Sequence, residues 1–124
     1  MGCYSLGRDG PVNPSRGEVW RVDLHPPVGH EQGGVRPALI VSVDQFNHGA
    51  ADLVVVLPIT KKDKGIASHV RVAPGPTNGL DVVSYIKCEE VRCVSKRRLS
   101  KYIGSTDSKT MQEVEYRVAI ILGL

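Results

Sequence analysis

No stretch of this sequence is apolar for long enough to cross a bilayer. The longest apolar runs, residues 38–41 and 53–57, are far shorter than the roughly 20 residues that a membrane-spanning helix needs. The N-terminal residues also lack the apolar core of a signal peptide. Three cysteines, Cys3, Cys88 and Cys93, cannot all pair within one chain, which argues against a disulfide framework. We therefore expect a protein with no membrane association and a reducing, cytoplasmic location.

The common motifs of nucleotide, metal and nucleophile chemistry are missing as well. The segment from Gly29 to Gly34 contains no Lys-Ser or Lys-Thr pair, which a Walker phosphate loop requires. There is no G-x-S-x-G elbow, H-E-x-x-H helix or Cys/His nucleophile pattern. Cys88 and Cys93 lack the two further ligands of a structural zinc site, so we interpret both as small buried hydrophobic residues. Aromatic residues make up only 5% of the chain, too few for a base-stacking platform. We expect neither a metal nor a cofactor.

Positive charge is present in modest excess and is concentrated in two places. The formal net charge is +3. Six Lys or Arg residues face two acids between Lys87 and Lys101, and a second cluster comprises Lys61, Lys62 and Lys64. Such clusters are typical of a surface that follows phosphate groups. A solvated basic rim without a partner explains the charge equally well.

The hydrophobic pattern predicts one mainly β domain. Residues 1–15 show no periodicity, so we assign them to a flexible tail and residues 16–124 to a single domain. Apolar or alternating segments that favour strands occupy residues 17–24, 37–43, 52–59, 68–72 and 82–94. Five or six short strands at this spacing are typical of an antiparallel barrel or sandwich.

One helix is predicted, at the C-terminal end of the chain. Its apolar stripe would contain Met111, Val114, Val118 and Ile121, between an N-cap at Asp107 and a terminating Gly123. Residues 99–104 are expected to form a single helical turn.

Three segments carry the residue types that bind phosphate. The loop 26–37 holds His30, Glu31, Gln32 and Arg36 among glycines, where a ligand can approach the backbone closely. An alternative is a plain surface ion pair between Arg36 and Glu31. Thr60 ends an apolar strand just before the basic turn, where its hydroxyl serves either a phosphate oxygen or its own turn.

Lys87 and Glu89 form the third such segment. The two residues are two positions apart in a strand-like stretch, so we expect them on one face of the sheet. They are consistent either with a phosphate site or with an exposed ion pair.

Four segments in their order along the chain resemble the MazF (PemK, Kid) family of toxin endoribonucleases. They are R-G-E-V-W-R-V-D-L from Arg16, V-G-H-E-Q-G-G-V-R-P-A-L-I-V-S from Val28, V-V-V-L-P-I-T from Val54 and I-K-C-E-E-V-R from Ile86. The resemblance implies a small SH3-like antiparallel β-barrel with a C-terminal α-helix. It also implies a homodimer that cuts single-stranded RNA without a metal, and a MazE-like antitoxin as partner.

The resemblance also suggests roles for particular residues. The usual catalytic positions of the family correspond to Arg36 and Thr60, and Glu31 matches an acid implicated in catalysis. Further positions of the Kid branch correspond to His30, Lys87 and Glu89, where Lys replaces Arg and Glu replaces Asp. The expected catalytic set is Arg36, Thr60, Glu31, His30 and Glu89, and the expected RNA-binding set is Lys87, Lys61, Lys62, Lys64 and Gln32.

The expected reaction is attack by the ribose 2′-hydroxyl, which leaves a 2′,3′-cyclic phosphate and a 5′-hydroxyl end. It needs a base, donors for the charge that develops on the phosphate, and an acid for the leaving group. Arg36 and Thr60 suit the donor role, and the base is Glu31, Glu89 or His30. The competing hypothesis is a non-catalytic protein, either a CcdB-like gyrase poison or a β-barrel that binds RNA or protein. The chain ends in Ile121-Leu122-Gly123-Leu124, without the terminal Trp of the CcdB toxins.

Overall fold

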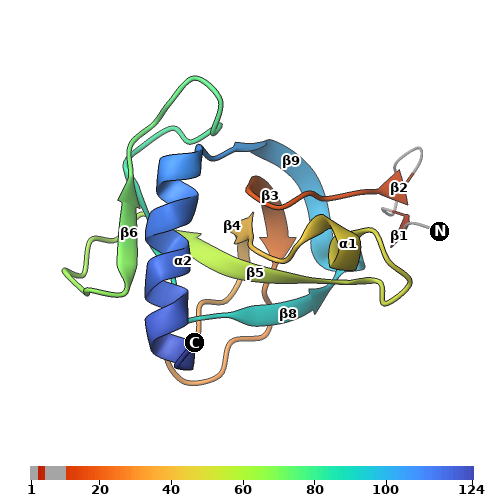
Figure 1. Ribbon diagram of the computed structural model, residues 1–124, viewed down its shortest axis with the longest axis horizontal. Helices are drawn as coiled ribbons and strands as arrows, with labels where there is room; N and C mark the ends of the chain where they lie inside the picture. The colour runs from red at the N-terminus through yellow and green to blue at the C-terminus, as the bar shows by residue number, and fades with distance from the viewer. Residues whose placement is uncertain (1–2, 5–10) are drawn as a thin grey trace.

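The computed structural model describes residues 3–4 and 11–124 (Figure 1). Two short strands, β1 (Cys3–Tyr4) and β2 (Pro11–Val12), pair antiparallel within the segment predicted as a tail. Residues 1–2 and 5–10, on which the rest of that prediction rests, lie outside the described residues.

The domain is one antiparallel sheet that curls on itself. Its strands are β3 (Glu18–Asp23), β4 (Val35–Ile40), β5 (Leu53–Thr60), β6 (His69–Val72), β7 (Ser84–Lys87), β8 (Arg92–Ser95) and β9 (Leu99–Ser105). They lie in the order β6-β7-β5-β4-β3-β9, with β8 also paired to β5. A single long helix, α2 (Ser108–Leu122), runs beside β6 (Figure 1). The expected mainly β fold with a C-terminal helix is confirmed.

The continuous apolar runs of β4 and β5 are explained by burial on both faces of the sheet. Ala38 and Ile40 pack into one core cluster, with Trp20 and Val56. Leu39 between them points the other way, into a second cluster. Because successive side chains of a strand face opposite sides, a strand with two covered faces needs apolar residues at every position.

The helix α2 covers the second cluster. Val114 is 1% exposed and packs there, whereas Ile121, which the periodicity predicted on the same stripe, is exposed. Asp107 Oδ1 accepts a hydrogen bond from the Thr110 N–H over 2.8 Å, and Gly123 ends the helix at a φ of 72°. Both predicted caps are confirmed. No helix in the described part of the chain is long and apolar enough to cross a membrane.

One local prediction is wrong, and two local features were not predicted. Residues 99–104 form strand β9, because Leu99 is buried opposite Val22 of β3. The helical turn comes earlier, as the 3-10 turn η1 (Lys96–Arg98). The stretch 82–94 is not one strand but two, β7 and β8, because β7 ends at Lys87 and the chain turns before Arg92. A short helix, α1 (Asp44–Asn47), precedes β5 and was not anticipated.

Candidate functional site

Arg36 and Thr60 are brought together by the pairing of β4 with β5. Arg36 lies near the start of β4, and Thr60 ends β5. Ala38 lies opposite Pro58 in this antiparallel pair, and continuing the register by two residues sets Arg36 opposite Thr60. Both residues border one groove of about 460 Å³. The two predicted phosphate-binding positions therefore share one end of the sheet.

The same register collects further polar side chains on this face. Thr60 is paired with Tyr85 of β7, and Lys87, two residues on, is paired with His69 of β6. Residues directly opposite in an antiparallel pair, and residues two apart, project from the same face. Arg36, Thr60, Lys87 and His69 consequently occupy one face.

Arg36 and Thr60 differ in their exposure and contacts. Arg36 is exposed, and its Nε donates to the Gly33 carbonyl over 3.3 Å. The alternative ion pair with Glu31 is not formed, because Glu31 accepts from the Val28 N–H instead. Thr60 is 6% exposed, and its Oγ1 accepts from the Lys62 N–H at 3.2 Å. That turn contact uses an oxygen lone pair, so the hydroxyl proton is still able to donate.

Cations outnumber acids along the groove. Its border includes Arg21, Arg36, Lys61 and Lys101 against the single acid Asp81. Of the predicted basic cluster, Lys61 borders the groove, whereas Lys62 and Lys64 are exposed on the loop that follows β5. This excess of positive charge favours a polyanion at this end of the sheet.

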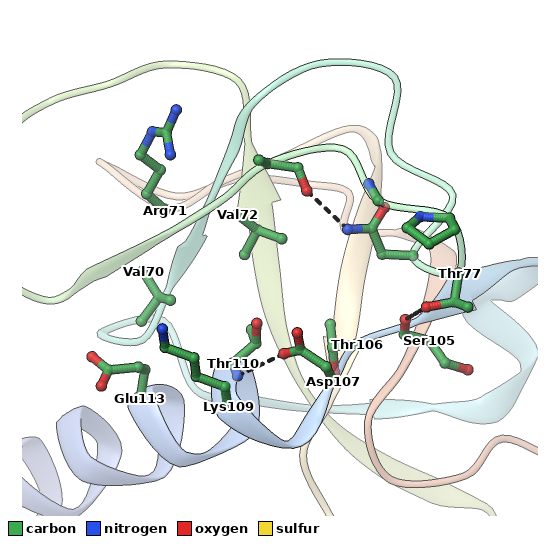
Figure 2. A pocket seen from close by; sticks show the side chains of 14 residues that line it. Val70, Arg71, Val72, Thr77, Ser105, Thr106, Asp107, Lys109, Thr110 and Glu113 are labelled. Atoms are coloured by element: carbon green, nitrogen blue, oxygen red, sulfur yellow. Dashed lines mark hydrogen bonds between the residues drawn. The ribbon is translucent and has the colours of Figure 1, made fainter.

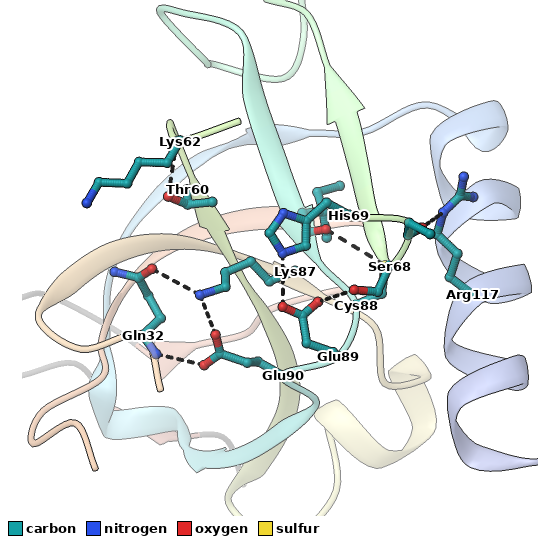
Figure 3. A network of polar contacts seen from close by, with 12 residues as sticks. Gln32, Thr60, Lys62, Ser68, His69, Lys87, Cys88, Glu89, Glu90 and Arg117 are labelled. Atoms are coloured by element: carbon teal, nitrogen blue, oxygen red, sulfur yellow. Dashed lines mark hydrogen bonds and ion pairs between the residues drawn. The ribbon is translucent and has the colours of Figure 1, made fainter. Parts of the chain in front are cut away.

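The loop between β3 and β4 is tied to the other strands through Gln32 (Figure 3). The Gln32 N–H donates to Glu90 Oε1 over 2.7 Å. Lys87 Nζ forms an ion pair with Glu90 Oε2 at 2.5 Å and a weaker contact of 3.4 Å to Gln32 Oε1. His30 and Glu31, in the same loop, are exposed. Of the two alternatives for Lys87 and Glu89, the exposed ion pair is not formed, because Lys87, at the end of β7, pairs with Glu90.

Glu89 has separate partners in the same network (Figure 3). Its carboxylate accepts from Ser68 Oγ at 2.8 Å and lies 2.9 Å from His69 Nε2. Partial burial acts to raise the pKa of Glu89, but hydrogen bonds from its own backbone N–H, His69 and Ser68 outweigh it, and the pKa is lowered from the ordinary 4.5. His69 Nδ1 is buried and has no partner among the described residues.

Sequence reasoning missed Glu90, His69 and Ser68 as members of this network. His69 and Ser68 lie in the segment 68–72, whose alternation predicted only a strand, and the His69 side chain is 3% exposed. The sequence offered one signal for Glu90. It follows Glu89 in a segment rich in β-branched residues, which favour burial, and a buried carboxylate needs a hydrogen-bond or ion-pair partner.

The two cysteines of the domain differ. Cys88 is fully buried, as predicted, and burial raises the pKa of its thiol to about 12. Cys93 is exposed, so the prediction that it is a buried hydrophobic residue is wrong. It lies opposite Val55 at the pairing of β8 with β5, with its side chain on the outer face.

A second hollow, of about 340 Å³, lies at the start of α2 (Figure 2). Its polar groups are largely satisfied within the fold. Asp107 caps the helix through Thr110, and Asn78 donates to Ala73 O while accepting from the Gly75 and Leu80 N–H groups. None of the predicted catalytic or RNA-binding residues lines this hollow.

The fold and the site together define a small curled β-sheet domain with a cation-rich groove at one end of the sheet. A family model described as "PemK-like, MazF-like toxin of type II toxin-antitoxin system" matches residues 15–122. The Endoribonuclease MazF of Staphylococcus saprophyticus subsp. saprophyticus is 34% identical over 110 residues, covering 88% of this chain and 91% of that protein. The Endoribonuclease MazF9 of Mycobacterium tuberculosis is 30% identical over 113 residues, covering 88% and 96%.

Solved structures agree with these sequence comparisons. MazF from Deinococcus radiodurans superposes with a TM-score of 0.78 at 28% identity, covering 91% of this chain and 99% of that one. An endoribonuclease from Mycobacterial species, solved in complex with its cognate antitoxin, gives 0.72 at 31% identity, covering 90% and 96%. The chain belongs to the PemK-like, MazF-like family of type II toxins.

Proposed function

We propose that this toxin is an endoribonuclease that cuts single-stranded RNA at the face shared by Arg36 and Thr60, without a metal. The observation that carries the proposal is the register of β4 and β5, which sets a guanidinium and a hydroxyl on one face of the sheet. Two such donors from adjacent strands are suited to the non-bridging oxygens of one phosphodiester. The names of the relatives, endoribonucleases, support the same reaction.

In the proposed reaction a base takes the proton of the ribose 2′-hydroxyl as its oxygen attacks the adjacent phosphorus. The P–O5′ bond breaks, and the leaving 5′-oxygen takes up a proton from solvent. Arg36 binds the phosphate, because a guanidinium remains charged and presents a fork of donors. Thr60 donates to a second oxygen. The products are a 2′,3′-cyclic phosphate and a 5′-hydroxyl end.

Glu31 is the base that the contacts favour. It is exposed in the loop that leads to Arg36, and its carboxylate is engaged only by the Val28 N–H among the described residues. Glu89 is a weaker base, since His69 and Ser68 hold its pKa below the ordinary value. His30, exposed in the same loop, is the remaining alternative, which Glu31→Gln and His30→Ala separate.

We propose further that the toxin acts as a homodimer in the cytoplasm and is neutralised by a MazE-like antitoxin. Two relatives support the antitoxin, because the mycobacterial endoribonuclease was solved with its cognate antitoxin and the Deinococcus radiodurans MazF with MazE. The excess of cations along the groove suits an acidic antitoxin segment.

A cleavage assay in EDTA tests the reaction. Purified protein is mixed with a single-stranded RNA library, and the new ends are identified by direct 5′-phosphorylation with a kinase. We expect 5′-hydroxyl ends, and a rate about 10²- to 10³-fold lower for Arg36→Ala and for Thr60→Ala. Thr60→Ser retains the hydroxyl and should keep most of the activity.

Lys109→Ala is the control, since it removes an exposed cation from the first turn of α2, away from the proposed face. Wild-type rates for both Arg36→Ala and Thr60→Ala contradict the assignment of the site. A wild-type protein that binds the library but leaves it intact in EDTA contradicts the proposed reaction.

A further inference from the structure

Gln32 is held at three polar groups by residues of β7, β8 and the turn between them. Its N–H donates to Glu90 at 2.7 Å, its carbonyl accepts from Arg92 Nη1 at 2.9 Å, and its side-chain oxygen faces Lys87 Nζ at 3.4 Å. Figure 3 shows Gln32, Lys87 and Glu90 converging from the loop and from the end of β7. Gln32 is thus the anchor of the β3–β4 loop.

Arg98 holds the start of the loop by donating to the His25 carbonyl, and Val28 and Glu31 bond to each other within it. Among the described residues, the bonds that tie residues 28–33 to β7, β8 and their turn all involve Gln32. Gly29 and Gly34 have φ values of 60° and 79°, in a region that glycine enters without strain. Glu31 and His30 extend into solvent. A glycine-rich segment loses much conformational freedom when it is ordered, so contacts from outside the loop must define where Glu31 lies.

The ion pair that supplies this anchor is buried, which is unusual for a stabilising device. The side chains of Lys87 and Glu90 are only 5% and 13% exposed. Desolvation of two charges offsets much of their attraction, and a buried pair contributes little more than apolar residues of the same size. The effect of the pair is to fix a position. Lys87 balances the charge of the Glu90 carboxylate and holds it in place, so that it accepts the Gln32 N–H in one position.

We propose that Glu90 is a positioning residue of the RNA-cleaving site. Its carboxylate, balanced by Lys87, holds Gln32 and thereby sets Glu31 relative to Arg36 and Thr60. This inference rests on the proposed endoribonuclease activity for its kinetic consequence, but its structural consequence is measured independently of activity. Lys87 also takes a new role in this proposal: it balances the charge of Glu90 and does not contact RNA directly.

Amide hydrogen exchange and single-turnover kinetics test the proposal together. Glu90→Ala removes the acceptor and the charge, whereas Glu90→Gln keeps an oxygen for the Gln32 N–H and removes only the charge. Glu113→Gln is the matched control, because it breaks an exposed ion pair with Arg117 on α2. We expect exchange to accelerate more in residues 26–34 than in β5 and α2 of Glu90→Ala, because the loop loses its anchor in addition to the stability that the whole fold loses.

The rate of RNA cleavage should fall about 100-fold in Glu90→Ala, as a small misplacement of a reacting group does elsewhere. The fall should be smaller in Glu90→Gln and absent in Glu113→Gln. Because Arg36 and Thr60 remain in place, KM should change much less than kcat. This split is what a general loss of folding would not produce.

The outcomes are distinct. Unaltered exchange in the loop, or exchange that rises equally in β5 and α2, overturns the positioning role. Faster loop exchange with an unchanged cleavage rate overturns it too. If the wild-type protein cuts no RNA, the proposed function fails, and accelerated loop exchange in Glu90→Ala would still support the anchor itself.

Discussion

Replacing Lys87 with Met distinguishes two roles for this residue: a buried charge that stabilises the fold, and an exposed charge that contacts RNA. Methionine has nearly the length and volume of lysine but no charge, so the change leaves almost no cavity. It strands the Glu90 carboxylate, which is 13% exposed and keeps only the Gln32 N–H as a hydrogen-bond partner among the described residues. The consequence is measured on the free energy of unfolding.

The magnitude follows from the burial of the pair. Removing one partner of a buried ion pair costs about 3–5 kcal/mol, because the other charge is left uncompensated. An exposed pair costs about 0–1 kcal/mol. The first range is a large share of the roughly 5–15 kcal/mol that stabilises an ordinary domain. Lys87→Met/Glu90→Gln removes the stranded charge and should recover much of the loss, which a double-mutant cycle measures as coupling.

Urea denaturation followed by circular dichroism gives the required numbers. A lower midpoint at an unchanged m-value reports a change in stability and not in the surface exposed on unfolding. Glu113→Gln serves as the exposed-pair control. A loss below about 1 kcal/mol for Lys87→Met would refute the reasoning, because that is the behaviour of an exposed lysine.

Three other outcomes are expected. Because the pKa of Glu89 is lower in the folded protein than the ordinary 4.5, the ionised carboxylate stabilises the fold above pH 4.5, and this effect is lost as the pH falls through the pKa of the folded state. Glu89→Gln should therefore make the free energy of unfolding less dependent on pH in acid. Urea midpoints measured at a series of pH values would show this. Val114→Ala should lower the free energy of unfolding by about 2 kcal/mol, since Val114 is 1% exposed, whereas Ile120→Ala, at a position 62% exposed, should change the urea midpoint little. RNA binding should weaken as salt rises, and Lys61→Ala should reduce the slope of log Kd against log salt by about one in a fluorescence titration, a result that an unchanged slope contradicts.

The strands were largely predictable, because the sequence signals for them are local. The apolar run 38–41 has no polar position, which indicates burial on both faces, and the structure places Leu39 and Ile40 in separate clusters. Asp107 and Gly123 were predictable for the same reason, since a cap acts within a few residues of the helix end.

The errors occurred where pairing with distant residues decides the outcome. Leu99 is extended because it is buried opposite Val22, some 77 positions earlier in the chain by the difference of the two numbers. Ile121 continues the helical period of Val114, yet it remains 42% exposed. Periodicity shows which residues share a face and does not show how far the neighbouring layer extends.

The sequence predicted that Arg36 and Thr60 lie together, but it did not predict the contacts around them. Arg36 and Thr60 come from two segments whose pairing follows from the order of the strands. The partner of Lys87 was not predictable, because the choice between Glu89 and Glu90 depends on where β7 ends. Strand ends are the least certain feature of any sequence pattern.

One register therefore builds both the core and the candidate site. Along β5, the alternation that sends Leu57 and Ile59 into the second cluster sends Thr60 to the opposite face, where Arg36 lies. A slip of one residue between β4 and β5 would turn this set over, setting buried apolar side chains in the site and the hydroxyl in the core. Since such a slip would also take Leu57 and Ile59 out of the second cluster, the packing that stabilises the core is what holds the guanidinium and the hydroxyl on one face.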